Sequence, residues 1–263
     1  MIKLENVGLA SPEQMGFIIE GMRNPMNSWE KSDSDICSME SGIECSYCSD
    51  YASCDKTGDD KYHLGLNDHS LMQRLSNAGT EHLKYMRMMP VYVRITAPLY
   101  WWKEFDTYKV GVVANSCSTM HKIAEKEFTL EDFSCDHLTE FIPGQKLKGW
   151  TLEDNDLIVL DDESDHGYSS VDILNITIKA LNFNRKKYLE TKDKKYWWQM
   201  IQLLPSNYNQ TRNVMLNYEV LANIYRQRKN HKLDEWREVC KWIESLPYSE
   251  LIIGKEEQAN GRQ

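Results

Sequence analysis

Aromatic and small polar side chains share one stretch of the chain, residues 97–121. Trp101 and Trp102 suit a buried wall better than a surface loop. Asn115, Ser118 and His121 follow within a short distance, and a core helix has little use for such a run of polar groups. An apolar wall that ends in a few polar groups is typical of a small-molecule pocket, so we expect a binding site here.

A second polar stripe occurs in the helix that the sequence predicts over residues 215–228. Asn217 and Asn223 are six residues apart, and Arg226 follows Asn223 by three, which places a polar stripe beside Leu221. One interpretation is a binding surface. The other is a solvated helix face on which Glu219 lies close to Asn223 and Arg226, and the spacing by itself favours this second interpretation.

The order of several short motifs resembles that of the flavin-dependent thymidylate synthases. The downstream motifs are Leu203-Leu204-Pro205, Tyr208, Asn217, Asn223 and Arg228, followed by Glu235-Trp236-Arg237. The upstream motifs are Gly79-Thr80-Glu81-His82, which resembles the family's Gly-His element, and Val93-Arg94-Ile95-Thr96-Ala97-Pro98, which resembles the strand before its signature. The resemblance covers residues 65–125 and 172–250, and it depends on order and spacing more than on any single motif.

The resemblance implies a role for each matching residue. It implies that Arg228 binds the pyrimidine and polarises a uracil carbonyl during catalysis, and that Ser118 lies near the uracil ring as a second catalytic and substrate-binding residue. Arg87 is expected to contact the anionic substrate. The residues expected to bind the cofactor are Asn217, Asn223, Asn115, Lys109 and His82.

The chain differs from the family at the positions where the family binds phosphates. Thr107-Tyr108-Lys109 stands at the place of the family's Arg-His-Arg, and Glu219 stands at the place of an arginine. A lysine supplies one point charge, whereas an arginine supplies a fork of donors that matches a phosphate. The chain therefore matches the family better at the positions that contact the bases than at the positions that bind phosphates.

The resemblance implies a function and leaves an alternative open. The implied function is binding of FAD and a dUMP-like pyrimidine nucleotide, with methylation or reduction of the uracil ring at C5. NADPH and methylenetetrahydrofolate are then the co-substrates, and a homotetramer is the implied assembly. The alternative is a nucleotide-binding or regulatory protein that keeps the fold without synthase activity.

Four cysteines cluster near the N-terminus: Cys37, Cys45, Cys48 and Cys54. Cys45 and Cys48 have the two-residue gap that lets both thiolates reach one tetrahedral zinc ion, but the outer two are irregularly spaced. A structural zinc site is one interpretation, and free thiols in a loop insertion are the other, which the irregular spacing favours.

Charge and composition exclude several classes of function. The chain has 263 residues, a formal net charge of −9 and a pI near 5.3, which argue against polymeric nucleic acid as a main partner. Hydrophobic residues make up 41% of the chain, typical of a globular protein, and no apolar run approaches the length of a membrane span. The sequence predicts a cytoplasmic protein with no membrane partner.

The elements predicted from the sequence form an α+β fold. We expect a single domain over residues 1–263, with a small central antiparallel or mixed sheet packed against several long helices. Residues 91–96 alternate as a strand, Pro98 begins a helix, and another helix is expected over 116–125. Asn67 or Asp68 is expected to cap the helix that ends near Gly79. Two insertions are predicted, one rich in Cys, Ser and Asp at about 29–62 and one acidic at about 127–170.

Overall fold

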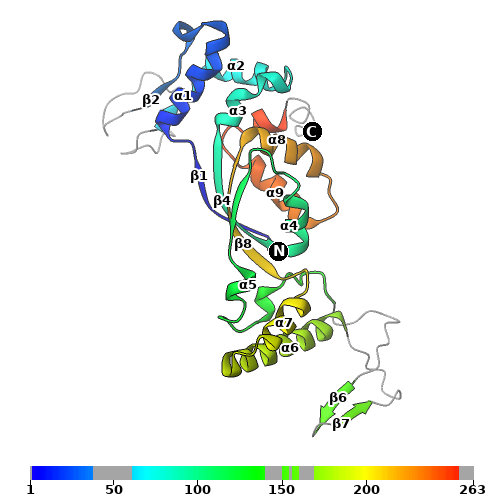
Figure 1. The fold of residues 1–263 in the computed structure, drawn as a ribbon. Helices are drawn as coiled ribbons and strands as arrows, with labels where there is room; N and C mark the ends of the chain where they lie inside the picture. Colours follow the sequence, from blue (N-terminus) through cyan, green and yellow to red (C-terminus); the bar gives the residue numbers. More distant parts are fainter. Residues whose placement is uncertain (1, 38–60, 140–149, 154–155, 160–168, 255–263) are drawn as a thin grey trace, which may run out of the picture. The chain divides into compact units, whose positions relative to one another are not determined.

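The computed structural model (Figure 1) describes residues 2–37, 61–139, 150–153, 156–159 and 169–254. These residues form two compact units. Unit 1 comprises residues 1–3, 96–106 and 116–212, and unit 2 comprises residues 4–95, 107–115 and 213–263. The single domain stays a prediction, and much of both predicted insertions lies outside the described residues. None of the described helices is long and apolar enough to cross a membrane.

Four strands form the main sheet, in the order β1-β4-β8-β5. They are β1 (Lys3–Leu9), β4 (Pro90–Pro98), β8 (Asn209–Asn217) and β5 (Val113–Ser116). Along β4, Val91, Val93 and Ile95 are buried, whereas Tyr92 and Arg94 between them are exposed. This alternation is the period of two that the sequence predicts for a strand with one covered face.

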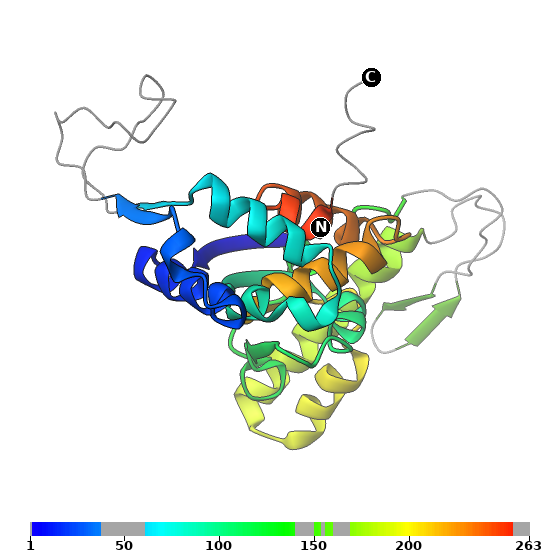
Figure 2. The ribbon, with the colours of Figure 1, turned by 90° about the horizontal axis from the view of Figure 1, so that it is seen from above.

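Unit 2 also contains the helices formed by the N-terminal and C-terminal parts of the sequence. They are α1 (Pro12–Arg23), α2 (Leu66–Ser76), α3 (Lys84–Met88), α8 (Tyr218–Arg228), α9 (Asp234–Glu244) and α10 (Glu250–Ile253), with a short hairpin of β2 (Asp35–Cys37) and β3 (Lys61–His63). Figure 2 shows these helices from above. α8 packs against α3, α9 and α10, and α10 also contacts α2.

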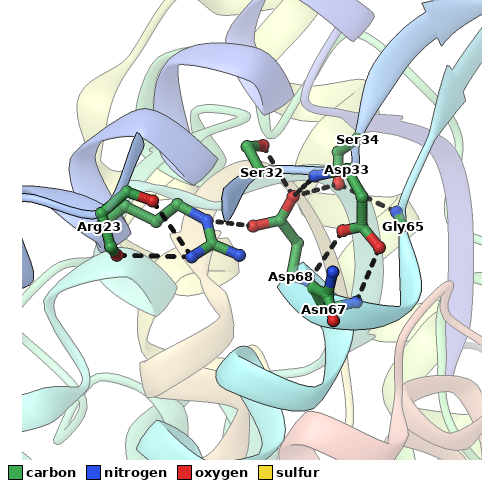
Figure 3. A network of polar contacts seen from close by, with 8 residues as sticks. Arg23, Ser32, Asp33, Ser34, Gly65, Asn67 and Asp68 are labelled. Carbon is green, nitrogen blue, oxygen red and sulfur yellow. Dashed lines mark hydrogen bonds and ion pairs between the residues drawn. The ribbon is translucent and has the colours of Figure 1, made fainter. Parts of the chain in front are cut away.

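A buried ion pair connects α1 to α2 (Figure 3). Arg23 at the end of α1 donates from Nε to Asp68 Oδ1 at 2.5 Å, and both side chains are almost completely buried. The second carboxylate oxygen of Asp68 accepts hydrogen bonds from the Ser32 and Ser34 hydroxyls, each at 2.7 Å. A buried ion pair is stable only when its remaining hydrogen-bonding capacity is filled, and here serines fill it.

The start of α2 is capped from a distant part of the chain. Asp33 accepts hydrogen bonds from the backbone N–H groups of Asn67 and Asp68, at 2.8 and 3.1 Å. A Cβ atom on Gly65, the residue before the helix, would lie 2.2 Å from the Asp33 carboxylate, so only glycine allows this approach. The expectation that Asn67 or Asp68 caps α2 is therefore wrong, because the capping oxygens come from Asp33.

Unit 1 has an aromatic core on the short helix α4 (Leu99–Phe105). Trp101 and Trp102 are buried, and Trp101 stacks on Phe105 with 5.1 Å between ring centroids. The indole N–H of Trp102 donates to the Gln210 carbonyl at 2.9 Å. The two tryptophans therefore form the buried wall that their sequence predicts.

A helical hairpin supplies the rest of the core of unit 1. α6 (Ser170–Thr191) packs along α7 (Lys194–Leu203), and Leu181 and Met200 are fully buried between them and the residues of 123–133. α5 (Thr119–Lys122) and the antiparallel pair β6 (Trp150–Glu153) and β7 (Asp156–Val159) complete the described part of this unit.

Two predicted helices begin in the wrong place. The helix expected from residue 215 begins at Tyr218, because residues 209–217 form strand β8. The helix expected over 116–125 is reduced to Thr119–Lys122, because Ser116 ends strand β5. In both places a strand runs directly into a helix, and the polar residues at the junction carry no period of either kind.

Candidate functional site

A large cavity in unit 2 lies along α8, and we call it the α8 cavity. Its volume is about 910 Å³, within the range of small-molecule sites. Five stretches of chain contribute to it: the end of α2 (Ser76, Asn77), the segment 80–87, the turn at 110–111, α8 with the residues that flank it, and residues 251–254 in and after α10. The predicted residues Asn217, Asn223 and Arg87 all line the α8 cavity, although they come from distant parts of the sequence.

Asn217 is fixed at the entrance to α8. It is the N-cap residue, and its Oδ1 accepts a hydrogen bond from the Val220 N–H at 3.0 Å. Its Nδ2 faces Gly111, where a Cβ atom would lie only 2.9 Å away. Gly111 also has a φ of +76°, so the backbone and the neighbouring amide both require glycine there.

Asn223 lies one and a half turns along α8 and is held by its own helix. Its Oδ1 accepts a hydrogen bond from Gln227 Nε2 at 2.9 Å. This hydrogen bond does not involve the NH₂ group of the Asn223 amide. The two asparagines therefore face one cavity with fixed orientation, which is the property that a ring with polar edges requires of its site.

The charges of the α8 cavity come from three basic side chains and one acid among the described lining residues: Arg87, Arg226, Lys229 and Glu219. Arg87 and Glu219 form a two-pronged ion pair, in which Arg87 Nε contacts Oε2 and Nη2 lies 2.9 Å from Oε1. The hydrogen bond and charge of Glu219 raise the pKa of Arg87 above its ordinary value. Glu219 thus pairs with Arg87 and not with Arg226, the partner that a purely solvated helix face suggested.

Arg228 contacts a different set of residues, and it is not one of the described residues that line the α8 cavity. Its Nε donates to the Tyr108 hydroxyl at 2.9 Å, and its guanidinium lies 4.8 Å from the Trp236 ring. Tyr108 in turn donates to Gln227 Oε1 at 2.9 Å. The segment that stands at the place of the family's Arg-His-Arg therefore contacts α8 through Tyr108.

Comparison with known proteins gives a match of fold alone. No protein family model and no curated protein sequence matches the chain. Thymidylate synthase X (ThyX) from Helicobacter pylori, crystallised with FAD and dUMP, matches with a TM-score of 0.55 and 14% identity over 95% of this chain and 96% of that chain. The chain has the ThyX fold. The α+β fold class predicted from the sequence is thereby confirmed.

Two further solved structures give the same result. A second ThyX structure from Helicobacter pylori, complexed with FAD and dUMP, matches with a TM-score of 0.53 and 15% identity over 95% of each chain. The UMP/dUMP methylase PolB from Streptomyces cacaoi, bound with 5-Br UMP, matches with a TM-score of 0.50 and 11% identity over 93% of this chain and 88% of that chain.

The remaining predicted site residues border the α8 cavity or lie elsewhere on the ThyX fold. His82 is half-exposed at the end of a short 3₁₀ turn (Thr80–His82), and its neighbours Thr80 and Leu83 line the cavity. Lys109 is exposed and precedes Val110 and Gly111, which also line it. Asn115 is exposed on β5, beside a shallow groove over the sheet that Tyr92 and Asn213 also line.

Ser118 lies in unit 1, next in the chain to a polar network that begins at Cys117. Its hydroxyl caps α5 by accepting from the His121 N–H at 3.0 Å. Nearby in the chain, the Cys117 carbonyl accepts from Gln210 Nε2, and Gln210 Oε1 accepts from Arg212 Nε. Arg212 also stacks 4.1 Å above Trp102 and pairs with Asp106, so this guanidinium is held in one orientation.

The zinc prediction is left open. Cys45, Cys48 and Cys54 lie outside the described residues, and Cys37 ends strand β2. No group of His, Cys, Asp and Glu side chains within the described ranges could hold a metal ion. The described cysteines with free thiols are Cys117, Cys135 and Cys240, and burial raises the pKa of Cys240 to about 11.

Sequence reasoning missed Lys229 and the polar end of α2. Lys229 continues the stripe of Asn223 and Arg226 by three more residues, so the helical period contained the signal. Ser76 and Asn77 gave no comparable signal, because only the packing of α10 against α2 and α8 brings them to the α8 cavity.

Proposed function

We propose that the protein binds a flavin and a pyrimidine nucleotide, and that it methylates or reduces the uracil ring at C5. The observation that carries this proposal is the convergence of Asn217, Asn223 and Arg87 on one cavity of about 910 Å³ in a chain with the ThyX fold. The order of motifs in the sequence already indicated Asn217 and Asn223, and Arg87 was expected as an anion contact. The three residues come from two segments about 130 residues apart along the chain.

The residues of the α8 cavity fit a flavin. The two asparagine amides supply donors and acceptors that match the polar edge of an isoalloxazine ring. Leu83, Met86 and Val220 supply an apolar lining against its hydrocarbon edge. Arg226 and Lys229 supply positive charge for the phosphates. A bound flavin would supply hydride chemistry.

The protein's own residues would bind and orient the two ligands. Asn217 and Asn223 would hold the flavin ring, the apolar residues would exclude water from it, and Arg226 would contact a phosphate oxygen. Arg228, by resemblance, would donate hydrogen bonds to a uracil carbonyl and stabilise negative charge on that oxygen. Tyr108 and Trp236 hold its guanidinium in one orientation for that task.

The first test is flavin binding. We expect the purified protein to be yellow, or to quench flavin fluorescence on titration with FAD. Asn223→Ala should weaken FAD binding by about tenfold, because it removes about one amide hydrogen bond and its geometry. Lys241→Ala is the matched control, since Lys241 lies on the exposed face of α9 and pairs only with its neighbour Glu238 among the described residues. A protein that binds no flavin would overturn the proposal.

A second candidate function is nucleotide binding without turnover. It is favoured by the ion pair of Arg87 with Glu219, because that arginine is occupied in the structure. Release of tritium from dUMP labelled at C5, in the presence of FAD, NADPH and methylenetetrahydrofolate, separates the two candidates. Turnover supports the enzyme, and tight binding of dUMP without release supports the binding protein.

A further inference from the structure

Glu219 is the only carboxylate among the described residues that line the α8 cavity. It stands in the first turn of α8, three residues before Ala222 and four before Asn223, and its side chain is about three-quarters buried. An acid in the first turn is favourable for the helix. In a cavity that is to receive a phosphate ester, however, a carboxylate repels the ligand unless a cation neutralises it.

Arg87 is that cation, and it uses its fork of donors on Glu219. Nε and Nη2 contact the two carboxylate oxygens, and Nη2 also lies 3.4 Å from the Thr80 carbonyl. A guanidinium binds a phosphate through the same pair of parallel N–H groups that it uses for a carboxylate. Arg87 therefore cannot offer this edge to a phosphate while Glu219 holds it.

The other cations that line the α8 cavity are Arg226 and Lys229, at the far end of α8. The asparagines that would hold a ring, Asn217 and Asn223, lie on the same helix beside Glu219. The α8 cavity thus has polar groups suited to a ring beside the Arg87–Glu219 ion pair. Its other cations, Arg226 and Lys229, lie about two turns or more along the helix from Glu219.

We propose that Glu219 sets the ligand specificity of the α8 cavity by withdrawing Arg87 from phosphate binding. The consequence is that the cavity recognises the ring of its ligand more strongly than its phosphate ester. This inference rests on the proposed function. It applies to a flavin nucleotide or to a pyrimidine nucleotide, since both carry a phosphate ester on a polar ring system.

The test compares phosphorylated and unphosphorylated ligands of one series. Riboflavin, FMN and FAD form the flavin arm, and deoxyuridine and dUMP form the pyrimidine arm. For the wild type and for Glu219→Gln, the dissociation constants are measured by fluorescence quenching or calorimetry at one fixed salt concentration. The readout is the ratio of affinities within a series, because a general loss of folding or packing would affect both members alike.

We expect Glu219→Gln to raise the affinity for FMN over riboflavin, or for dUMP over deoxyuridine, by roughly tenfold or more, the gain typical of one charge-assisted contact. The double variant Arg87→Gln with Glu219→Gln should lose this gain. Glu238→Gln is the control, since Glu238 forms an exposed ion pair with Lys241 on α9. Thermal unfolding of each variant checks that the fold is intact.

Three outcomes count against the inference, and they differ. An unchanged ratio in Glu219→Gln overturns it and leaves the proposed function standing. A gain that persists in the double variant also overturns it, because the effect would then not pass through Arg87. If neither series binds to any variant, the proposed function fails and this inference fails with it.

Discussion

Gly111 shows how one residue constrains the proposed ring site. It combines a positive φ with a close approach of the Asn217 amide and of Val220 Cγ2, at 2.9 and 3.2 Å from the position of a Cβ atom. Any side chain here would strain the backbone and press on the residue that caps α8. The cap and the ring contact proposed for Asn217 therefore depend on a glycine at position 111.

Gly111→Ala should lower both stability and flavin affinity. The positive φ is expected to cost about 1–2 kcal/mol of unfolding free energy, and the shift of Asn217 should weaken FAD binding. Urea unfolding and FAD titration measure the two effects. Gly8→Ala on β1 is the control, since its Cβ would make only an ordinary contact with Tyr92 at 3.6 Å and Gly8 does not line the α8 cavity. Equal losses of FAD affinity in the two variants would contradict the role given to Asn217.

Helix α8 presents different chemistry on different faces. Glu219, Asn223 and Arg226 line the α8 cavity, whereas Arg228 is directed to Tyr108 and Trp236. Arg228 follows Asn223 by five positions, which turns its side chain well away from that of the asparagine. We therefore expect the residues proposed for the flavin and the arginine proposed for the pyrimidine to act through separate faces of one helix.

Arg228→Ala should separate the two ligands. Loss of a charged hydrogen-bond donor is expected to weaken dUMP binding by roughly 10- to 100-fold, while FAD binding stays close to the wild type. Arg226→Ala should do the reverse. Because Arg228 also stacks on Trp236, thermal unfolding is measured in parallel. Tyr108→Phe removes the hydroxyl that contacts both Arg228 and Gln227 while it keeps the ring. Unchanged dUMP affinity in Arg228→Ala would show that this arginine only holds α8 to its neighbours.

The contact between α1 and α2 depends on the Asp68 carboxylate. Burial by itself raises the pKa of Asp68, but the hydrogen bonds from Ser34, Ser32 and Arg23 outweigh it and hold the pKa below its ordinary value. A carboxyl whose pKa is lowered by folding stabilises the fold above the pKa of the unfolded chain. That contribution is lost as the pH falls through the lower pKa of the folded state.

Asp68→Asn should destabilise the protein by about 3–5 kcal/mol at pH 7, because it leaves the buried Arg23 without a counter-charge. The difference from the wild type should narrow as the pH falls below about 4, where the unfolded chain begins to bind the proton. Denaturant unfolding over a range of pH measures this difference. Asp33→Asn is the comparison. Its two carboxylate oxygens each accept one capping N–H, so the asparagine keeps only one of these hydrogen bonds and should cost about 1 kcal/mol, with no buried cation left unpaired. A difference that stays constant with pH would contradict the assignment to Asp68.

At the scale of the whole molecule, two compact units share the strands β4 and β8. Residues 90–95 and 213–217 of these strands belong to unit 2, and residues 96–98 and 209–212 belong to unit 1. The α8 cavity and Arg228 belong to unit 2, whereas Ser118 and Arg212 belong to unit 1. The homotetramer and the zinc site remain predictions, which native mass measurement and metal analysis can test.

The sequence by itself determined the α+β class, the strand at 91–96 and the helix that follows Pro98, and it indicated Asn217, Asn223 and Arg87 as candidate site residues. These follow from local rules: caps, helical and strand periods, and the order of motifs. It did not determine that residues 209–217 form a strand, because β8 is central in the sheet and its alternation is broken by polar residues. The tertiary structure alone decided that Glu219 holds Arg87 and that Arg228 faces Tyr108, because residues 132 and 120 positions apart meet only through packing.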